Sequence, residues 1–245
     1  MQPLNNWLKN NHLLNFSNFV NILFKQKCLL CDTNIDVLQP NIHAACRACL
    51  NDLPWHPKTS CPQCGLESDS NLCGSCLSST PDFDATRAVF LYSFPIDAMM
   101  VRYKYGNMLS LCSFFGQLLS EKIAPETVDV IIPMPMHPAR IKERGFNQAH
   151  EIAKVLTKNC KEKLDFKSAK RVKLTPPQAS LPLKARVKNI KGAFSVNSNL
   201  AGKSVAIVDD VMTTGASLNE LAKTLKKAGA SHVECWVIAR TLPHK

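Results

Sequence analysis

The chain has 245 residues, enough for a small module and one domain of ordinary size. Hydrophobic residues make up 45% of it and charged residues 20%, a globular composition that excludes a disordered or fibrous chain. The formal net charge is +11, and residues 140–191 carry all of the excess, with 15 Lys and Arg but 4 Asp and Glu. This local excess predicts a polyanionic partner, such as a pyrophosphate, a nucleotide or a nucleic-acid backbone; for residues 158–173 a solvated lysine-rich face is the alternative.

The first 27 residues combine apolar positions, among them Leu13, Phe16, Phe19 and Leu23, with many asparagines. They lack the basic start, continuous apolar run and cleavage site of a secretory signal. We expect an amphipathic leader helix over residues 1–27 that packs on the rest of the protein, with membrane attachment as the alternative. Because the longest apolar stretches are too short to span a bilayer, the sequence predicts a cytoplasmic protein without stable membrane insertion.

Eight of the 11 cysteines form four Cys-x-x-Cys pairs, and the other three are isolated. One pair can point two thiolates at a single tetrahedral metal, and two pairs complete a closed Cys₄ zinc site. The sequence therefore predicts two structural zinc sites. In the simplest grouping, the first four of the eight paired cysteines form one site and the other four form the second. The predicted ligands are Cys28, Cys31, Cys46, Cys49, Cys61, Cys64, Cys73 and Cys76. Disulfides and thioredoxin-type redox pairs are the alternatives, disfavoured by the lack of an export signal and by the number of pairs.

The spacing of turns and apolar runs predicts a double zinc ribbon over residues 28–80 and a larger domain over residues 81–245. In the larger domain, strands are predicted over residues 86–94, 128–134, 169–172, 205–208 and 232–239. Helices are predicted over residues 96–105, 109–122, 148–156 and 218–228. This alternation is typical of an α/β fold with a mainly parallel sheet covered on both faces.

A proline-rich stretch with spaced cations follows the strand predicted over residues 128–134. A restricted loop at a strand edge, followed by Arg140 and Arg144, is well suited to hold a diphosphate, because guanidinium groups grip phosphate oxygens with a planar fork. His137 is a weaker candidate, since a lone histidine after a strand more often makes a hydrogen bond within its loop. Lys104, from another part of the fold, is a further basic candidate.

A long polar loop rich in proline begins near Thr175. Long loops inside compact domains often act as lids, and Gln178, Lys184 and Arg186 are the candidate ligand contacts of this one. The alternative is a connecting loop without a role in ligand binding, which returns to the sheet at residues 192–194.

Residues 205–217 form the segment that is most informative about function. An apolar strand ends there in Asp209 and Asp210, which are costly to bury unpaired and therefore belong where the strand meets a ligand or solvent. The turn that follows leads into a helix, so its amides, its hydroxyls and the positive helix end suit a phosphate. These turn residues are Thr213, Thr214, Gly215, Ala216 and Ser217. Carboxylates for sugar hydroxyls beside amides for a phosphate predict a ribose 5-phosphate site; a strand–loop–helix unit with solvated acids is the alternative.

This segment resembles the phosphoribosyl pyrophosphate (PRPP) signature of type I phosphoribosyltransferases. Together with the cysteine pairs and residues 52–55, 144–148, 175–178 and 192–194, it is similar to the ComF family, which includes the ComFC and GntX proteins. That family joins an N-terminal double zinc ribbon to a domain of the type I phosphoribosyltransferase fold. The resemblance runs from about Cys28 to Arg240.

The resemblance implies that PRPP binds together with Mg²⁺, with Asp209 and Asp210 as catalytic-site acids on the 2′- and 3′-hydroxyls. The turn at residues 213–217 would hold the 5′-phosphate. Lys104, Arg140 and Arg144 would neutralise charge on the pyrophosphate, and the loop with Gln178 would close over the ligand.

The resemblance also implies a role in natural competence, in which the protein handles incoming single-stranded DNA with the DNA-processing proteins of the competence machinery. A GntX-like metabolic role is the alternative. Two chemical classes remain open: a phosphoribosyl-transferring or hydrolysing enzyme whose acceptor is not identified, and a non-catalytic PRPP- or nucleotide-binding scaffold or regulator. Many phosphoribosyltransferases are homodimers, a state that this sequence does not require.

DNA contacts are expected mainly from residues 140–191, because residues 1–80 are near neutral, with 5 Lys and Arg and 5 Asp and Glu. The candidate contacts are Lys163, Lys167, Lys170 and Lys173.

Overall fold

The computed structural model describes residues 27–35, 44–106, 110–123, 127–158, 160, 163–175 and 189–242. The chain divides into two compact units, residues 1–53 and residues 54–245. The first unit carries the first four predicted metal ligands, and the second carries the other four together with the main sheet. The predicted leader lies outside the described residues except for Lys27, and the predicted boundaries at residues 27 and 80 stay predictions.

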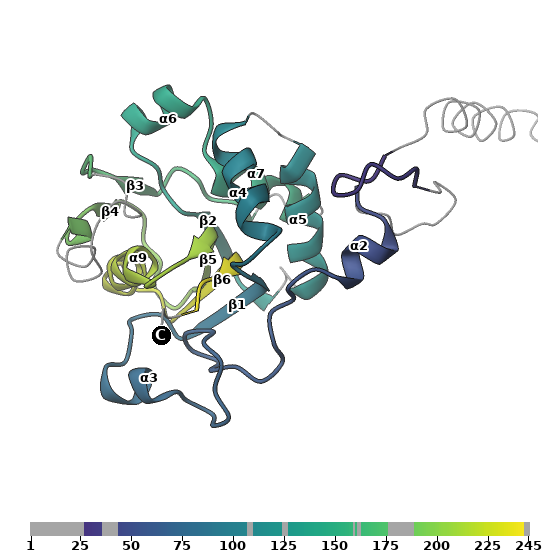
Figure 1. The fold of residues 1–245 in the computed structure, drawn as a ribbon. Helices are drawn as coiled ribbons and strands as arrows, with labels where there is room; N and C mark the ends of the chain where they lie inside the picture. Colours follow the sequence, from purple (N-terminus) through teal and green to yellow (C-terminus); the bar gives the residue numbers. More distant parts are fainter. Residues whose placement is uncertain are drawn as a thin grey trace, which may run out of the picture. The chain divides into compact units, whose positions relative to one another are not determined.

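A four-stranded parallel sheet forms the centre of the second unit (Figure 1). Its strands lie in the order β1 (Ala85–Leu91), β6 (His232–Arg240), β5 (Ser204–Met212) and β2 (Val130–Pro133). The strands β2, β5 and β6 are buried over most of their length, as expected for parallel strands covered on both faces. The predicted α/β class with a mainly parallel sheet is confirmed.

Helices cover both faces of this sheet (Figure 1). They are α4 (Ile96–Tyr105), α5 (Ser110–Lys122), α7 (Gln148–Leu156) and α9 (Ala216–Lys227). On one face α5 and α7 pack closely, because Gly116 leaves room: a Cβ atom there would lie 2.5 Å from the Cβ atom of Val155. On the other face α9 buries Leu218, Leu221 and Leu225 against β5 and β6.

Two elements differ from the sequence-based expectation. The strand β5 continues past the two acids to Met212, because Asp209, Val211 and Met212 still pair with β6. The return at residues 192–194 does not lead to the main sheet: β4 (Phe194–Val196) pairs antiparallel with β3 (Ala169–Arg171) as a separate two-stranded sheet. Both differences come from pairing between distant segments, which local sequence patterns do not encode.

A further helix, α6 (Pro138–Arg144), forms where the sequence indicates a loop. The Nδ1 atom of His137 accepts a hydrogen bond from the backbone N–H of Ala139 at 3.2 Å, Pro138 occupies the first turn, and Gly145 ends the helix in the left-handed region. Proline is well tolerated in a first helical turn, so the proline-rich sequence starts a helix here rather than preventing one.

Two short helices belong to the cysteine clusters. The helix α2 (Arg47–Asn51) begins directly after Cys46, and α3 (Gly74–Ser78) begins directly after Cys73. Within the part of the chain that the structure describes, no helix combines the length and the apolar composition needed to cross a bilayer.

Candidate functional site

The two adjacent acids lie near the carboxyl end of β5, at the sheet edge where parallel α/β folds bind ligands. Side chains alternate along a strand, so the two carboxylates are directed to opposite faces of the sheet. Asp209 continues the row of Val205 and Ile207, which packs toward α9, and Asp210 lies on the face of α4. Extension of the strand through the acids therefore gives each one a different set of neighbours.

Asp210 forms an ion pair with Lys104 from the last turn of α4, with 2.8 Å between Oδ2 and Nζ. Both side chains are largely buried, at 13% and 24% exposed. Burial acts to lower the pKa of Lys104, but the ion pair with Asp210 and the charge of Asp209 outweigh it and raise that pKa. The hydroxyl of Tyr103 donates to the carbonyl of Gln148 at 2.9 Å and so fixes α4 on α7. The structure thus brings the predicted Lys104 to the predicted acids.

Asp209 has an unusually basic carboxylate. Burial, followed by the negative charge of Asp210, raises the pKa of Asp209 to about 8, although a backbone hydrogen bond and the charges of Lys104 and Arg171 act in the opposite direction. The raised pKa favours the protonated form of the Asp209 carboxyl group in the free protein. A cationic or hydroxyl-rich ligand would favour its ionised form.

Arg171 is a site residue that our sequence analysis did not single out. It ends β3, donates a hydrogen bond to the hydroxyl of Thr175, and has its Cζ atom 5.7 Å from the ring centroid of Phe194. Burial lowers the pKa of Arg171, Asp209 opposes this shift and Arg140 adds to it, so the three charges act on one another. The sequence feature that could have identified Arg171 is its position near the end of the strand predicted over residues 169–172, within the basic residues 140–191.

The predicted phosphate turn joins β5 to α9. Gly215 has a φ of +77°, a backbone conformation that strains residues with a side chain and therefore favours glycine at this position. The Thr214 hydroxyl accepts a hydrogen bond from the N–H of Ala216 at 3.3 Å. Because α9 begins at Ala216, the turn places backbone amides and hydroxyls at the positive end of a 12-residue helix.

Two of the three predicted pyrophosphate contacts, Arg140 and Arg144, lie on α6, which follows β2 from the same edge of the sheet. Arg140 pairs with Glu143 at 2.6 Å. Arg144 donates to Oε1 of Gln148 at 3.0 Å, and its Cζ atom lies 5.1 Å from the ring centroid of Tyr105. His137 makes the helix-capping bond described above, in line with its weaker candidacy.

The predicted lid contacts Gln178, Lys184 and Arg186 lie outside the described residues. The segment that returns from this loop is attached to α9, since the N–H of Gly192 donates to the Glu220 carboxylate at 2.7 Å.

The eight paired cysteines form two clusters, and each cluster brings its four Sγ atoms within 4.8 Å of one another. The first contains Cys28, Cys31, Cys46 and Cys49, and the second contains Cys61, Cys64, Cys73 and Cys76. Sγ atoms are 3.7 Å apart for Cys31 and Cys46 and 3.4 Å apart for Cys64 and Cys73. A tetrahedral ion with bonds of about 2.3 Å to sulfur needs a spacing of about 3.8 Å, so both donor sets fit a metal such as zinc. The sequential grouping of the cysteines is confirmed.

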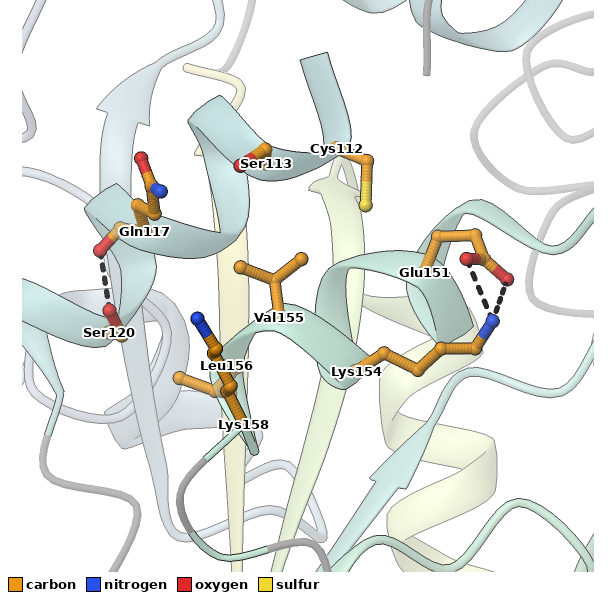
Figure 2. Close-up of a pocket in the computed structure, with 9 residues that line it drawn as sticks. All are labelled: Cys112, Ser113, Gln117, Ser120, Glu151, Lys154, Val155, Leu156 and Lys158. Carbon is orange, nitrogen blue, oxygen red and sulfur yellow. Dashed lines mark hydrogen bonds and ion pairs between the residues drawn. The ribbon is translucent and has the colours of Figure 1, made fainter. Parts of the chain in front are cut away.

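A surface pocket of about 500 Å³ lies apart from these groups, between α5 and α7 (Figure 2). It is lined by Cys112, Ser113, Gln117, Ser120, Glu151, Lys154, Val155, Leu156 and Lys158. Glu151 and Lys154 are paired to each other at 2.8 Å, as the dashed lines in Figure 2 show. The pocket contains none of the predicted ligand residues, so the chemistry of this chain points to the sheet edge instead.

Comparison with known proteins agrees with this arrangement. A family model described as a phosphoribosyl transferase domain matches residues 115–243, which include the two acids and the turn. The chain is 30% identical over 244 residues to competence protein F of Haemophilus influenzae, covering 93% of this chain and 100% of that protein. It is 32% identical over 225 residues to DNA utilization protein YhgH of Escherichia coli, covering 88% and 97%.

A more distant relative is competence protein ComFC of Bacillus subtilis, with 26% identity over 242 residues, 89% of this chain and 97% of that protein. This chain therefore belongs to the ComF/YhgH family, with a phosphoribosyltransferase domain and two Cys₄ clusters.

Proposed function

We propose that this protein binds PRPP with Mg²⁺ at the carboxyl edge of its sheet and acts in the use of incoming single-stranded DNA. One observation carries the ligand proposal: Asp209 and Asp210, compensated by Lys104 and Arg171, lie directly before a glycine turn at the start of α9. The names of the relatives, two competence proteins and a DNA utilization protein, support the biological role.

Each part of PRPP has a chemically suitable group in this site. The ribose hydroxyls would donate to the carboxylates of Asp209 and Asp210, and the amides of the turn at residues 213–217 would donate to the 5′-phosphate. Arg140 and Arg144 would contact the pyrophosphate with planar, charged forks. When bound, Mg²⁺ supplies positive charge between the diphosphate and the ribose hydroxyls. Two structural zinc ions in the Cys₄ clusters complete the proposed cofactors.

Turnover is a separate question from binding. If pyrophosphate departs, Arg140, Arg144 and Lys104 would stabilise the negative charge that develops on it, which is usually the largest contribution that a protein makes to catalysis. Lys104 pairs with Asp210 in the free site, so it would have to exchange this partner for the ligand. The described residues offer no recognisable nucleobase pocket, so the proposal names no acceptor.

Calorimetric titration of the zinc-loaded protein with PRPP and Mg²⁺ tests the ligand proposal. We expect micromolar affinity for the wild type and a loss of about a hundredfold or more in Asp209→Ala/Asp210→Ala, because both hydroxyl acceptors are removed. The variant Asp69→Ala, which removes an exposed carboxylate outside this site, is the matched control and should bind like the wild type. A well-folded wild type that does not bind PRPP would contradict the proposal. Pyrophosphate release with single-stranded DNA present then separates enzyme from binding module.

A specific surface supports the DNA part of the proposal. Lys167 and Lys170 are exposed. Phe166, which precedes Lys167 in the sequence, is 51% exposed, and its ring stacks on that of His150 with 4.7 Å between the ring centroids. The Nζ atom of Lys167 is 5.7 Å from the Phe166 ring centroid. An exposed aromatic ring beside cations suits single-stranded nucleic acid, in which bases are free to stack.

The four predicted lysines are not equivalent in this surface. The ammonium group of Lys163 donates to the carbonyl of Val128 at 2.7 Å, and that of Lys173 donates to the carbonyl of Lys191 at 2.8 Å. These two lysines therefore help to hold the chain in place, which makes Lys167 and Lys170 the cleaner probes of a phosphate contact.

Lys167→Gln/Lys170→Gln should weaken binding of a fluorescent single-stranded oligonucleotide by about tenfold at low salt and reduce the salt slope by about one to two. The expected cause is the loss of two phosphate contacts with their counterion release. Lys223→Gln/Lys227→Gln, which removes two exposed charges from α9, is the matched control. Equal losses in the two double variants would mean that net charge alone, and not this surface, attracts the DNA.

A further inference from the structure

Arg240 joins the second metal cluster to the phosphate turn. It is the last residue of β6, only 4% of it is exposed, and it pairs in register with Met212 of β5. Its Nε atom donates to the carbonyl of Cys64 at 2.8 Å. Its Nη1 atom donates to the carbonyl of Met212 at 3.1 Å and also to that of Thr213. One guanidinium group thus bridges a metal-binding knuckle and the first residue of the turn.

Four backbone carbonyls of the knuckle accept hydrogen bonds from residues outside it, and for three of them the partner is a residue of the sheet. These carbonyls belong to Pro62, Gln63, Cys64 and Gly65. Thr86 of β1 donates its N–H to the first at 2.8 Å and its hydroxyl to the second at 2.6 Å. Arg240 donates to the third, and the ring of His56 is hydrogen-bonded to the fourth at 2.7 Å. The sheet therefore fixes the orientation of the first three carbonyls, and His56 fixes that of the fourth.

The two cysteines of the knuckle fix the orientation of its carbonyls from the side of the metal site. Cys61 and Cys64 both belong to the metal site, and Gly65 turns the chain with a φ of +69°. A bound metal would hold the knuckle in this shape, and its loss would free the Cys64 carbonyl to turn away. A buried guanidinium that loses an acceptor must either move or remain unsatisfied, and moving releases the Thr213 carbonyl.

The choice of residue fits this bridging task. A guanidinium group has donors on several nitrogens in a rigid plane, so it can bond the knuckle and the turn at once, whereas an ammonium group acts as a single point. All of its acceptors are backbone carbonyls, so the hydrogen bonds from Arg240 constrain the path of the chain and not the rotamer of a side chain.

We propose that Arg240 is a positioning residue, which holds the 5′-phosphate turn in the shape that the metal-loaded second cluster dictates. The cluster of Cys61, Cys64, Cys73 and Cys76 would then set the affinity for a sugar 5′-phosphate without touching it. The ligand part of this inference rests on the proposed PRPP site, but the structural link between cluster and turn does not.

The first test compares Arg240→Gln and the milder Arg240→Lys with Arg87→Gln in the full-length, zinc-loaded protein. Arg87 is the matched control, because it lies on β1 and pairs with Glu234 at 3.0 Å, away from the turn. In Arg240→Gln we expect faster hydrogen exchange in both residues 61–66 and residues 213–217. We also expect about tenfold weaker binding of ribose 5-phosphate, whereas binding of Mg²⁺-pyrophosphate, which has no 5′-phosphate, should change by less than about twofold.

The second test uses the wild type and relies on the reciprocity of coupled sites. Ribose 5-phosphate should slow hydrogen exchange in residues 61–66, and removal of zinc by a chelator should speed it in residues 213–217. The inference would be overturned if neither the chelator nor Arg240→Gln changed the rate of hydrogen exchange in residues 213–217. It would also be overturned if Arg240→Gln weakened the binding of ribose 5-phosphate and of Mg²⁺-pyrophosphate equally. A wild type that binds neither ligand would refute the proposed function, while exchange in the free protein would still decide whether cluster and turn are linked.

Discussion

Replacement of Cys61 by serine should remove the metal from the second cluster and lower the Tm of the full-length protein by more than about 10 °C. Cys61, Cys64 and Cys76 are buried and form a small core of their own, with Leu66 and Leu72 packed against it. A metal-sulfur centre supplies most of the stability of such a small module, because few apolar side chains are available. The loss spreads to the sheet, since the knuckle is hydrogen-bonded to β1 and β6.

The matched control is Cys31→Ser. Cys31 is an exposed ligand of the first cluster and belongs to the other compact unit, so its loss should remove one zinc ion per chain with little change in the main unfolding transition. Zinc content and differential scanning calorimetry measure both effects. A Cys61→Ser protein that loses its metal but keeps its Tm within about 2 °C would show that the cluster is dispensable for the sheet.

Asp209→Asn should stabilise the free protein, and the gain should grow as the pH rises. The pKa of Asp209 is about 8 in the folded protein, because burial and Asp210 disfavour its charge, and about 4 in an unfolded chain. Between these values the folded protein holds one proton more than the unfolded chain, so the stability that this carboxyl group contributes is fully present below about pH 4 and is lost as the pH approaches 8. Asparagine does not titrate and avoids this loss.

Thermal unfolding over this pH range measures the effect. We expect the Tm difference between Asp209→Asn and wild type to be small near pH 5 and to reach about 5–10 °C near pH 8, where it should level off. Asp69→Asn, which changes an exposed carboxylate, is the control and should give no such trend. A difference that is constant with pH would mean that Asp209 is already ionised in the free site. The same variant should bind PRPP more weakly, which would mark Asp209 as a residue kept for ligand binding at the expense of stability.

Local patterns predicted the elements whose formation depends on nearby residues. The helices at residues 96–105 and 148–156 have the predicted bounds, because their apolar periodicity is unbroken. The cysteine grouping followed from spacing, and the acids and turn from one contiguous segment. The residues of each of these parts are close together in the sequence, so short-range chain geometry is enough to bring them together in the structure.

The parts that escaped prediction depend on pairing between distant segments. The charge of Arg171 acts on Asp209 from β3, which belongs to a separate sheet with β4. Arg240 hydrogen-bonds the carbonyl of Met212 because it lies opposite that residue in the strand register, 28 residues later in the sequence. The helix α6 was missed for a different reason: at its start the backbone N–H of Ala139 donates a capping bond to His137, which a proline-rich composition does not indicate. A charged residue at the end of a predicted strand is the signal to examine in such cases.

The strand order has a consequence for synthesis of the chain. The strand β6 lies between β1 and β5, although it follows both of them in the sequence. On the ribosome, β1 and β5 therefore emerge with the edges that β6 will occupy still unpaired, and such edges invite pairing with other chains. Arg240 is the last residue of β6, so the sheet is completed and the knuckle is hydrogen-bonded to the turn in the same late step of folding.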